Sequence, residues 1–159
     1  PKHHATAHAT VLNAMIDLMG EVDEFDTFSY FLPTHCPFIS VKDINEGFEK
    51  LSDCSCYSVV GMTKMPETIQ LSCMMSKDNV LPVFDNLTCG MTNSKYIKEY
   101  YKPAGFYMAK WNWLLENKNF FKGDVKGVIV PSERAIDIDT IEDIKYAETV
   151  AKLSPDFTI

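Results

Sequence analysis

The chain has 159 residues, a length that fits one domain spanning 1–159, and 46% of them are hydrophobic, which is enough to build a core. The formal charge of -7 excludes nucleic acid and anionic membrane as main partners, because both bind through clustered Lys and Arg. No stretch has the length of a transmembrane helix, no signal-peptide pattern is present, and the odd count of 5 cysteines predicts reduced thiols in the cytoplasm.

The first half of the chain alternates expected helices and strands. Apolar residues at helical spacing predict helices at 6–19 and 41–51. Short runs rich in aromatic or β-branched residues predict buried strands at 28–32 and 57–63. A turn at Lys77-Asp78-Asn79 predicts a hairpin whose strands run from 70 to 75 and from 80 to 84.

The second half continues the alternation. Strands are expected at 105–109 and 126–131, a short helix at 111–117, and an extended segment at 135–139 before a closing helix at 140–153. The buried face of that helix is expected to carry Ile144, Ala147, Val150 and Ala151. The pattern favours an α/β fold with three layers and a mostly parallel sheet, in which ligands bind beyond the carboxyl ends of the strands. The central hairpin is expected to be an insertion suited to a dimer contact or a lid.

The segment Asp137-Ile138-Asp139-Thr140 carries the strongest chemical signal. In an extended strand, Asp137 and Asp139 would point to the same side, and two neighbouring carboxylates repel unless a cation lies between them. A divalent cation that also binds phosphate oxygens is a common such partner. Asp139 or Thr140 is also a suitable helix N-cap, with Asp143 at capping-box spacing. Spacing alone leaves both interpretations open, and the two are compatible.

Other polar residues give weaker signals. His4 and His8 lie one turn apart on the first expected helix, a spacing that can bind a transition metal, but solvated histidines at a helix end are the favoured interpretation. His35 and Cys36 could be a base and a nucleophile, yet adjacent loop residues rarely meet the required geometry and no third orienting group is visible.

Four segments, in matching order, resemble the acylneuraminate cytidylyltransferases (CMP-sialic acid synthetases). The loop Leu32–Phe38 resembles the Gln-Pro-Thr-Ser-Pro-Leu-Arg loop of that family, and Tyr101–Tyr107 resembles its Arg-Pro-Asn-Gly-Ala-Ile-Tyr stretch. Phe120 and Phe121 are similar to a paired-phenylalanine segment. Arg134–Thr140, followed by Asp143, resembles the Ser-Ile/Val-Asp-Ile-Asp-Thr…Asp motif, which is the most specific of the four.

This resemblance implies a sheet of the nucleotide-diphospho-sugar transferase (Rossmann-like) type and a specific reaction. The anomeric hydroxyl of a sialic-acid-type sugar attacks the α-phosphate of CTP, giving CMP-sugar and pyrophosphate. It also implies Mg²⁺, held by Asp137 and Asp139 as the catalytic and metal-binding residues. The implied substrate-binding residues are Thr34, Lys102, Gly105, Phe120 and Phe121. Residues of about 85–125 are implied to form a sugar-site and dimerisation insertion, and the protein is implied to be a homodimer.

The chain also departs from the family pattern. Leu32, Phe38 and Ala104 stand where the family has polar groups that recognise the sugar. The family's Gly-, Ser-, Arg- and Lys-rich nucleotide loop is expected ahead of Pro1, so the chain alone is expected to be weakly active or inactive. A non-catalytic binding or assembly module, or an enzyme for another keto-deoxy sugar acid, are therefore the alternatives.

Overall fold

The computed structural model describes residues 13–18, 28–31, 35–53, 55–65, 67–85, 90 and 98–154. A helical stretch at 13–18 comes first, and the remaining helix of the predicted 6–19 span lies outside the described residues. The elements that follow are β1 (Phe28–Phe31), α2 (Val41–Ser52), β2 (Ser58–Lys64), the 3-10 helix η1 (Glu67–Leu71), β3 (Cys73–Ser76), β4 (Asn79–Pro82), β5 (Tyr101–Ala109), α4 (Trp111–Asn117), β6 (Val125–Ile129) and α5 (Ile141–Leu153).

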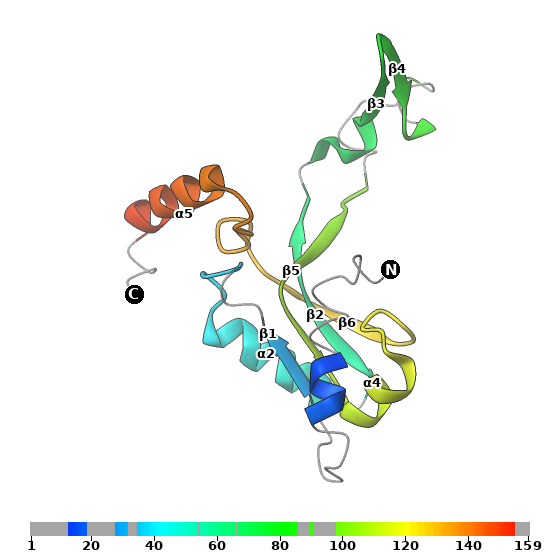
Figure 1. Ribbon diagram of the computed structural model, residues 1–159, viewed down its shortest axis with the longest axis vertical. Helices are drawn as coiled ribbons and strands as arrows, with labels where there is room; N and C mark the ends of the chain where they lie inside the picture. Colours follow the sequence, from blue (N-terminus) through cyan, green and yellow to red (C-terminus); the bar gives the residue numbers. More distant parts are fainter. Residues whose placement is uncertain are drawn as a thin grey trace.

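The central sheet has four strands in the order β1-β5-β2-β6 (Figure 1). Strand β5 is antiparallel to both β1 and β2, whereas β2 and β6 are parallel. Strands β1, β2 and β6 therefore share one direction, and β5 alone runs against them. The predicted α/β fold is confirmed, and the sheet is a mixed one because the single reversed strand lies inside it.

Two cores cover the two faces of this sheet, and β5 contributes to both. Phe106 and Met108 pack with Leu51 of α2 on one face. The alternate residue Tyr107 packs with Trp111 of α4 on the other face. Because side chains alternate along a strand, the buried run of β5 supplies two faces at once and makes a helix-sheet-helix arrangement of three layers.

The predicted extent of the closing helix is confirmed, but its predicted buried face is wrong in part. Ala147 is buried, whereas Ile144 is 45% exposed. In Figure 1, α5 stands apart from the sheet at the end of the segment that follows β6, so its apolar residues have little to pack against. Residues 135–139, expected to be extended, form no strand in the structure.

The hairpin of β3 and β4 forms an arm that projects away from the sheet (Figure 1). Its apolar side chains are exposed, and Met75 is the most exposed of them at 67%. By contrast, β5 and α4, which fall within the predicted insertion at 85–125, belong to the central sheet and its core. The projecting part of the described chain is therefore the hairpin that precedes this range.

None of the described helices combines the length with the apolar character that crossing a bilayer requires.

Candidate functional site

A large cavity lies at the carboxyl ends of the parallel strands β2 and β6. Its volume is about 700 Å³. It is lined by Thr63, Lys64, Met65, Lys102, Ile129, Val130, Pro131, Ser132, Ala135, Ile136, Asp137, Asp143 and Tyr146. This is the position at which open α/β sheets bind ligands, because loops leaving neighbouring parallel strands diverge there. One wall of this cavity is apolar. The lysines that line the cavity belong to β2 and β5, and the aspartates belong to α5 and to the segment before it.

A smaller cavity of about 80 Å³ adjoins the first. Its lining residues are Cys36, Lys102, Pro103, Ala104, Gly105, Tyr107, Ala135 and Asp137. Lys102, Ala135 and Asp137 line both cavities. The structure therefore brings together the cation of Lys102 and one of the two carboxylates that the sequence singles out. The two residues are 35 positions apart in the chain.

Asp137 is held against the loop that precedes α2. The backbone N–H of Ile138 donates to the carbonyl of His35 over 2.7 Å. The thiol of Cys36 lies 3.8 Å from Oδ1 of Asp137. Burial of Cys36, and after it the charge and hydrogen bond of Asp137, raise the pKa of this thiol to about 11. A thiol held protonated in this way is a poor nucleophile, which argues against the pairing of His35 and Cys36 as base and nucleophile.

The helix cap at the start of α5 is confirmed and is made by Thr140 and Asp143. The Thr140 hydroxyl accepts from the Asp143 N–H over 3.2 Å, and the Asp143 carboxylate accepts from the Thr140 N–H over 2.8 Å. The Thr140 hydroxyl also donates to the Asp143 carboxylate over 2.7 Å, and this hydrogen bond, followed by that from the Thr140 N–H, lowers the pKa of Asp143. Since this capping box is complete, the carboxylates of Asp137 and Asp139 are not needed to begin the helix.

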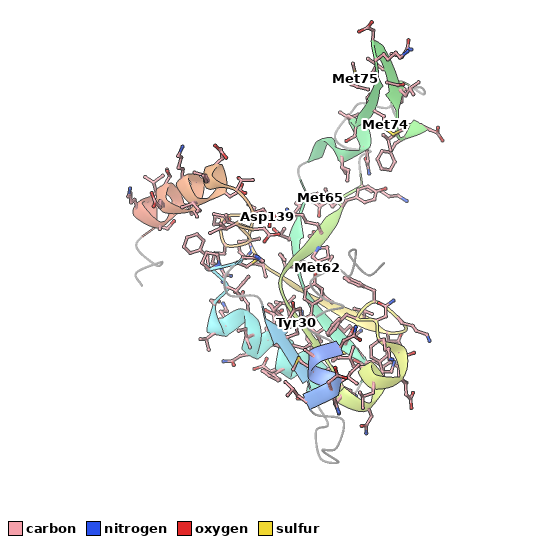
Figure 2. The ribbon with its side chains drawn as sticks, viewed as in Figure 1. Tyr30, Met62, Met65, Met74, Met75 and Asp139 are labelled. Atoms are coloured by element: carbon pink, nitrogen blue, oxygen red, sulfur yellow. The ribbon has the colours of Figure 1, made fainter. Side chains whose placement is uncertain are left out.

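Asp137 lines both cavities and can serve as a ligand for a hard divalent cation, whereas Asp139 lines neither cavity. Both residues are exposed, and Figure 2 shows Asp139 in the segment between β6 and α5. Among the described side chains, neither carboxylate forms an ion pair with a Lys or Arg. The described residues also hold no cluster of three or more His, Cys, Asp or Glu. Mg²⁺ commonly takes only one or two carboxylates and completes its shell with water and substrate phosphates, so this donor set suits it.

Gly105, predicted to lie at the substrate site, lines the smaller cavity. Its backbone conformation would be strained for any other residue. Its φ is +79°, and a Cβ built there would lie 2.3 Å from Cδ1 of Ile39. Glycine is therefore required both for the conformation of β5 at this point and for the close approach of the loop before α2.

The two predicted phenylalanines lie in different surroundings. Phe120 is 6% exposed and belongs to the core cluster with Tyr30 and Tyr107. Phe121 is 53% exposed, and its ring meets that of Tyr107 edge to face, with centroids 6.2 Å apart. Tyr107 in turn lines the smaller cavity. The remaining predicted residue, Thr34, lies outside the described residues.

Sequence reasoning missed Thr63 and Tyr146, which line the large cavity. Thr63 is 3% exposed, and its hydroxyl has no hydrogen-bond partner among the described residues. A threonine near the end of an otherwise apolar strand was the available signal. Tyr146 lies on the solvent-facing part of α5 and gave no signal, because only the tertiary arrangement brings this helix to the cavity.

Comparison with known proteins finds similarity to cytidylyltransferases. No protein-family model matches the chain. Pseudaminic acid cytidylyltransferase of Campylobacter jejuni subsp. jejuni serotype O:2 is 22% identical over 151 residues, which are 95% of this chain and 65% of that protein. The enzyme of the same name from serotype O:23/36 gives the same values, 22% over 151 residues, with 95% and 65% coverage. The chain thus spans about 65% of the length of these curated relatives.

A solved structure shares the fold. The CMP:2-keto-3-deoxy-manno-octonic acid synthetase complexed with CTP superposes with a TM-score of 0.60 at 10% sequence identity, covering 89% of this chain and 68% of that one. The resemblance to cytidylyltransferases, predicted from the aspartate motif and its flanking segments, is confirmed by the two pseudaminic acid cytidylyltransferases, and the solved structure confirms the shared fold.

Proposed function

We propose that this chain provides the sugar and metal side of a cytidylyltransferase that joins CMP to a nonulosonic sugar acid and releases pyrophosphate. The observation that carries the proposal is the meeting of Lys102 and Asp137 in both cavities, at the carboxyl ends of β2 and β6. The cytidylyltransferase relatives and the shared fold support the reaction class.

Lys102 supplies the positive charge for the carboxylate of the sugar acid. The close approach of Gly105 to Ile39 holds this part of β5 against the loop before α2, and Lys102 lies in the same strand at the wall of both cavities. A lysine offers a point charge rather than a planar fork, and it therefore fixes the position of the carboxylate more than its orientation. The apolar wall formed by Met65, Ile129 and Val130 excludes water from the rest of the sugar.

Asp137 and Asp139 would hold Mg²⁺ in this proposal. When bound, the ion neutralises triphosphate charge and stabilises the phosphoryl group during transfer from CTP to the anomeric hydroxyl. The bond that forms joins the anomeric oxygen to the α-phosphorus, and the bond that breaks releases pyrophosphate. Phe120, Phe121 and Thr34 remain predicted substrate-site residues.

We also propose that the protein acts as a homodimer in the cytoplasm. The arm formed by β3 and β4 exposes apolar side chains, and an isolated two-stranded hairpin is only marginally stable in water. A second copy would cover that surface. The cytoplasmic assignment rests on Cys36, Cys56 and Cys73, which are free thiols, a state that reducing compartments maintain.

The test of the enzyme proposal is pyrophosphate release by the complete protein. It is mixed with CTP, Mg²⁺ and one sugar acid at a time: pseudaminic acid, an acylneuraminic acid and 2-keto-3-deoxy-manno-octonic acid. Asp137→Asn and Asp139→Asn keep shape but remove charge, and each is expected to lower the rate by about 10²-fold, the size typical for a group that stabilises transition-state charge. Glu142→Gln is the matched control, because Glu142 is an exposed carboxylate in the first turn of α5, outside the aspartate motif.

Two results would contradict the proposal. Absence of pyrophosphate with every sugar acid, together with absence of Mg²⁺-dependent CTP binding, would favour a non-catalytic binding module. Equal rates for the wild type, Asp137→Asn and Asp139→Asn would show that the aspartate pair holds no catalytic metal.

A further inference from the structure

Arg134 joins the turn after β6 to the N-terminus of α2. Its Nη2 donates to Oδ1 of Asp43 over 2.8 Å, and its Nη1 bonds Oδ2 of the same carboxylate. Nη1 also donates to the hydroxyl of Ser40 over 2.7 Å. Asp43 is 3% exposed and Arg134 is half-buried, so water reaches this ion pair only in part, and its two parallel hydrogen bonds fix the orientation of both groups.

Asp43 serves two partners at once. As the third residue of α2 it completes the capping box, accepting from the N–H of Ser40 over 2.9 Å and from the Ser40 hydroxyl over 2.7 Å. Cap formation by itself needs no arginine, as the capping box of α5 demonstrates with Thr140 and Asp143 alone. The guanidinium of Arg134 is therefore not required for the cap. It connects the start of α2 to the segment after β6, and Arg134 and Asp43 are 91 positions apart in the sequence.

That tie lies beside the proposed metal-binding residues. Arg134 precedes Asp137 by one short stretch, Ala135-Ile136, and both of these residues are buried. On the other side of Asp137, the N–H of Ile138 bonds the carbonyl of His35. The carboxylate of Asp137 thus lies between two attachments, and both attachments end on the segment from His35 to Asp43.

We infer that the Arg134–Asp43 ion pair is a positioning device that sets the place of Asp137, and through it the affinity of the metal site. This inference rests on the proposed function. The arginine fork is essential to it, because a lysine would keep the charge but could not hold both oxygens of the Asp43 carboxylate. Residues that orient metal ligands without touching the metal typically change metal affinity by about 10- to 100-fold when altered.

The experiment measures Mn²⁺ binding to the complete protein by electron paramagnetic resonance, with CTP present and no sugar acid. Mn²⁺ serves as the probe because it accepts the oxygen ligands that Mg²⁺ uses. The variants are Arg134→Lys and Asp43→Asn, with Asp137→Asn as the reference for direct loss of a ligand. Val128→Ala is the stability control, since Val128 is fully buried in the core and lines neither cavity. Thermal unfolding of every variant is recorded, and binding is measured well below the lowest transition.

Arg134→Lys and Asp43→Asn are expected to weaken Mn²⁺ binding by about tenfold or more. Val128→Ala is expected to bind Mn²⁺ as the wild type does, although its transition temperature falls by about as much as those of Arg134→Lys and Asp43→Asn. Wild-type affinity in Arg134→Lys, with a clear loss in Asp137→Asn, would overturn the inference alone. Equal weakening in Val128→Ala would also overturn it, by reducing the effect to general destabilisation. Wild-type affinity in Asp137→Asn would overturn the proposed metal site and the positioning role with it.

Discussion

The thiol of Cys36 lies 3.8 Å from the carboxylate of Asp137, in a cavity that Lys102 also lines. Burial, followed by the negative charge of Asp137, raises the pKa of this thiol from 9.0 to about 11. Only the thiolate reacts with alkylating reagents, so the reactive fraction at pH 8 falls about 100-fold relative to an ordinary thiol. Cys36 should therefore resist alkylation in the folded protein.

Iodoacetamide labelling, followed by peptide mass spectrometry, checks this prediction. Cys73 is exposed on the hairpin arm and is expected to react first. Cys56, which is buried and whose pKa is raised by that burial, is expected to resist as Cys36 does. In urea all three should react at similar rates. Labelling of native Cys36 as fast as that of Cys73 would contradict the buried contact with Asp137.

The Asp43–Arg134 pair should make stability depend on acid. Burial alone would raise the pKa of Asp43, but the hydrogen bonds from Arg134 and Ser40 outweigh it, and the pKa in the folded protein is lowered. A carboxyl whose pKa is lower in the folded state stabilises the fold above its ordinary pKa of 3.8, and this stabilisation is lost as the pH falls through the folded-state value. The wild type should therefore lose this contribution on acidification, whereas Asp43→Asn has none to lose.

Urea unfolding at pH 7 and at pH 3 provides the measurement. At pH 7, Asp43→Asn is expected to lower the free energy of unfolding by about 3 kcal/mol, because it leaves the guanidinium of Arg134 without its counter-ion in a largely buried position. At pH 3 the difference from wild type should shrink. Glu46→Gln is the control, since the exposed pair of Glu46 and Lys50 is expected to contribute less than about 1 kcal/mol. A difference that grows in acid would contradict the prediction.

Local patterns in the sequence predicted the helices well and their surroundings poorly. The start of α2 at Val41 and the full extent of α4, Trp111–Asn117, follow from apolar spacing and turn residues that lie within each segment. The burial of Ile144 was predicted wrongly because a helical stripe shows that an apolar face exists, but not that another element covers it. The reversed direction of β5 was also not predictable, since strand direction depends on connections between distant elements.

The candidate site was predictable only where the chemistry is local. Asp137 and Asp139 stand out because two carboxylates on one side of an extended segment repel unless a cation lies between them, and the capping role of Thr140 follows from Asp143 at the third helical position. The ion pair of Arg134 with Asp43 could not be found in this way. The two residues are 91 positions apart, and in the sequence each one looks like an ordinary charged surface residue.

The hydroxyl of Thr63 should lower the free energy of unfolding, although it lines the large cavity and can contact a ligand there. It is 3% exposed, and its hydroxyl has no partner in the described part of the chain. Burying an unpaired polar group costs about 1–3 kcal/mol, so Thr63→Val, which fills nearly the same volume and suits a strand, is expected to raise the free energy of unfolding by about 1 kcal/mol. Thr63→Ser keeps the hydroxyl and should not.

Ligand binding gives the complementary measurement for Thr63. If the hydroxyl contacts a bound sugar acid, Thr63→Val should weaken binding by about tenfold, which corresponds to one lost hydrogen bond, and Thr63→Ser should retain most of the affinity. Isothermal titration with the sugar acid that supports pyrophosphate release would show this. A Thr63→Val protein that is less stable than the wild type would mean that the hydroxyl has a structural partner.

The exposed hairpin arm should hold the proposed dimer together. Met75 and Val80 face each other across β3 and β4 and are 67% and 59% exposed (Figure 2 labels Met75 at the arm). Replacing them together, Met75→Lys with Val80→Glu, places opposite charges on a cross-strand pair, which favours strand pairing while removing this apolar pair from the surface of the arm. The double variant is therefore expected to be monomeric at micromolar concentrations at which the wild type is dimeric.

Sedimentation velocity over a range of concentrations distinguishes the two states. Leu153→Lys is the matched control, because Leu153 is 77% exposed at the end of α5 and a cation there suits the C-terminus of a helix. This control should remain dimeric, which would show that losing an exposed apolar residue elsewhere does not dissociate the protein. A wild type that sediments as a monomer, or a double variant that still dimerises, would mean that the arm contacts something other than a second copy.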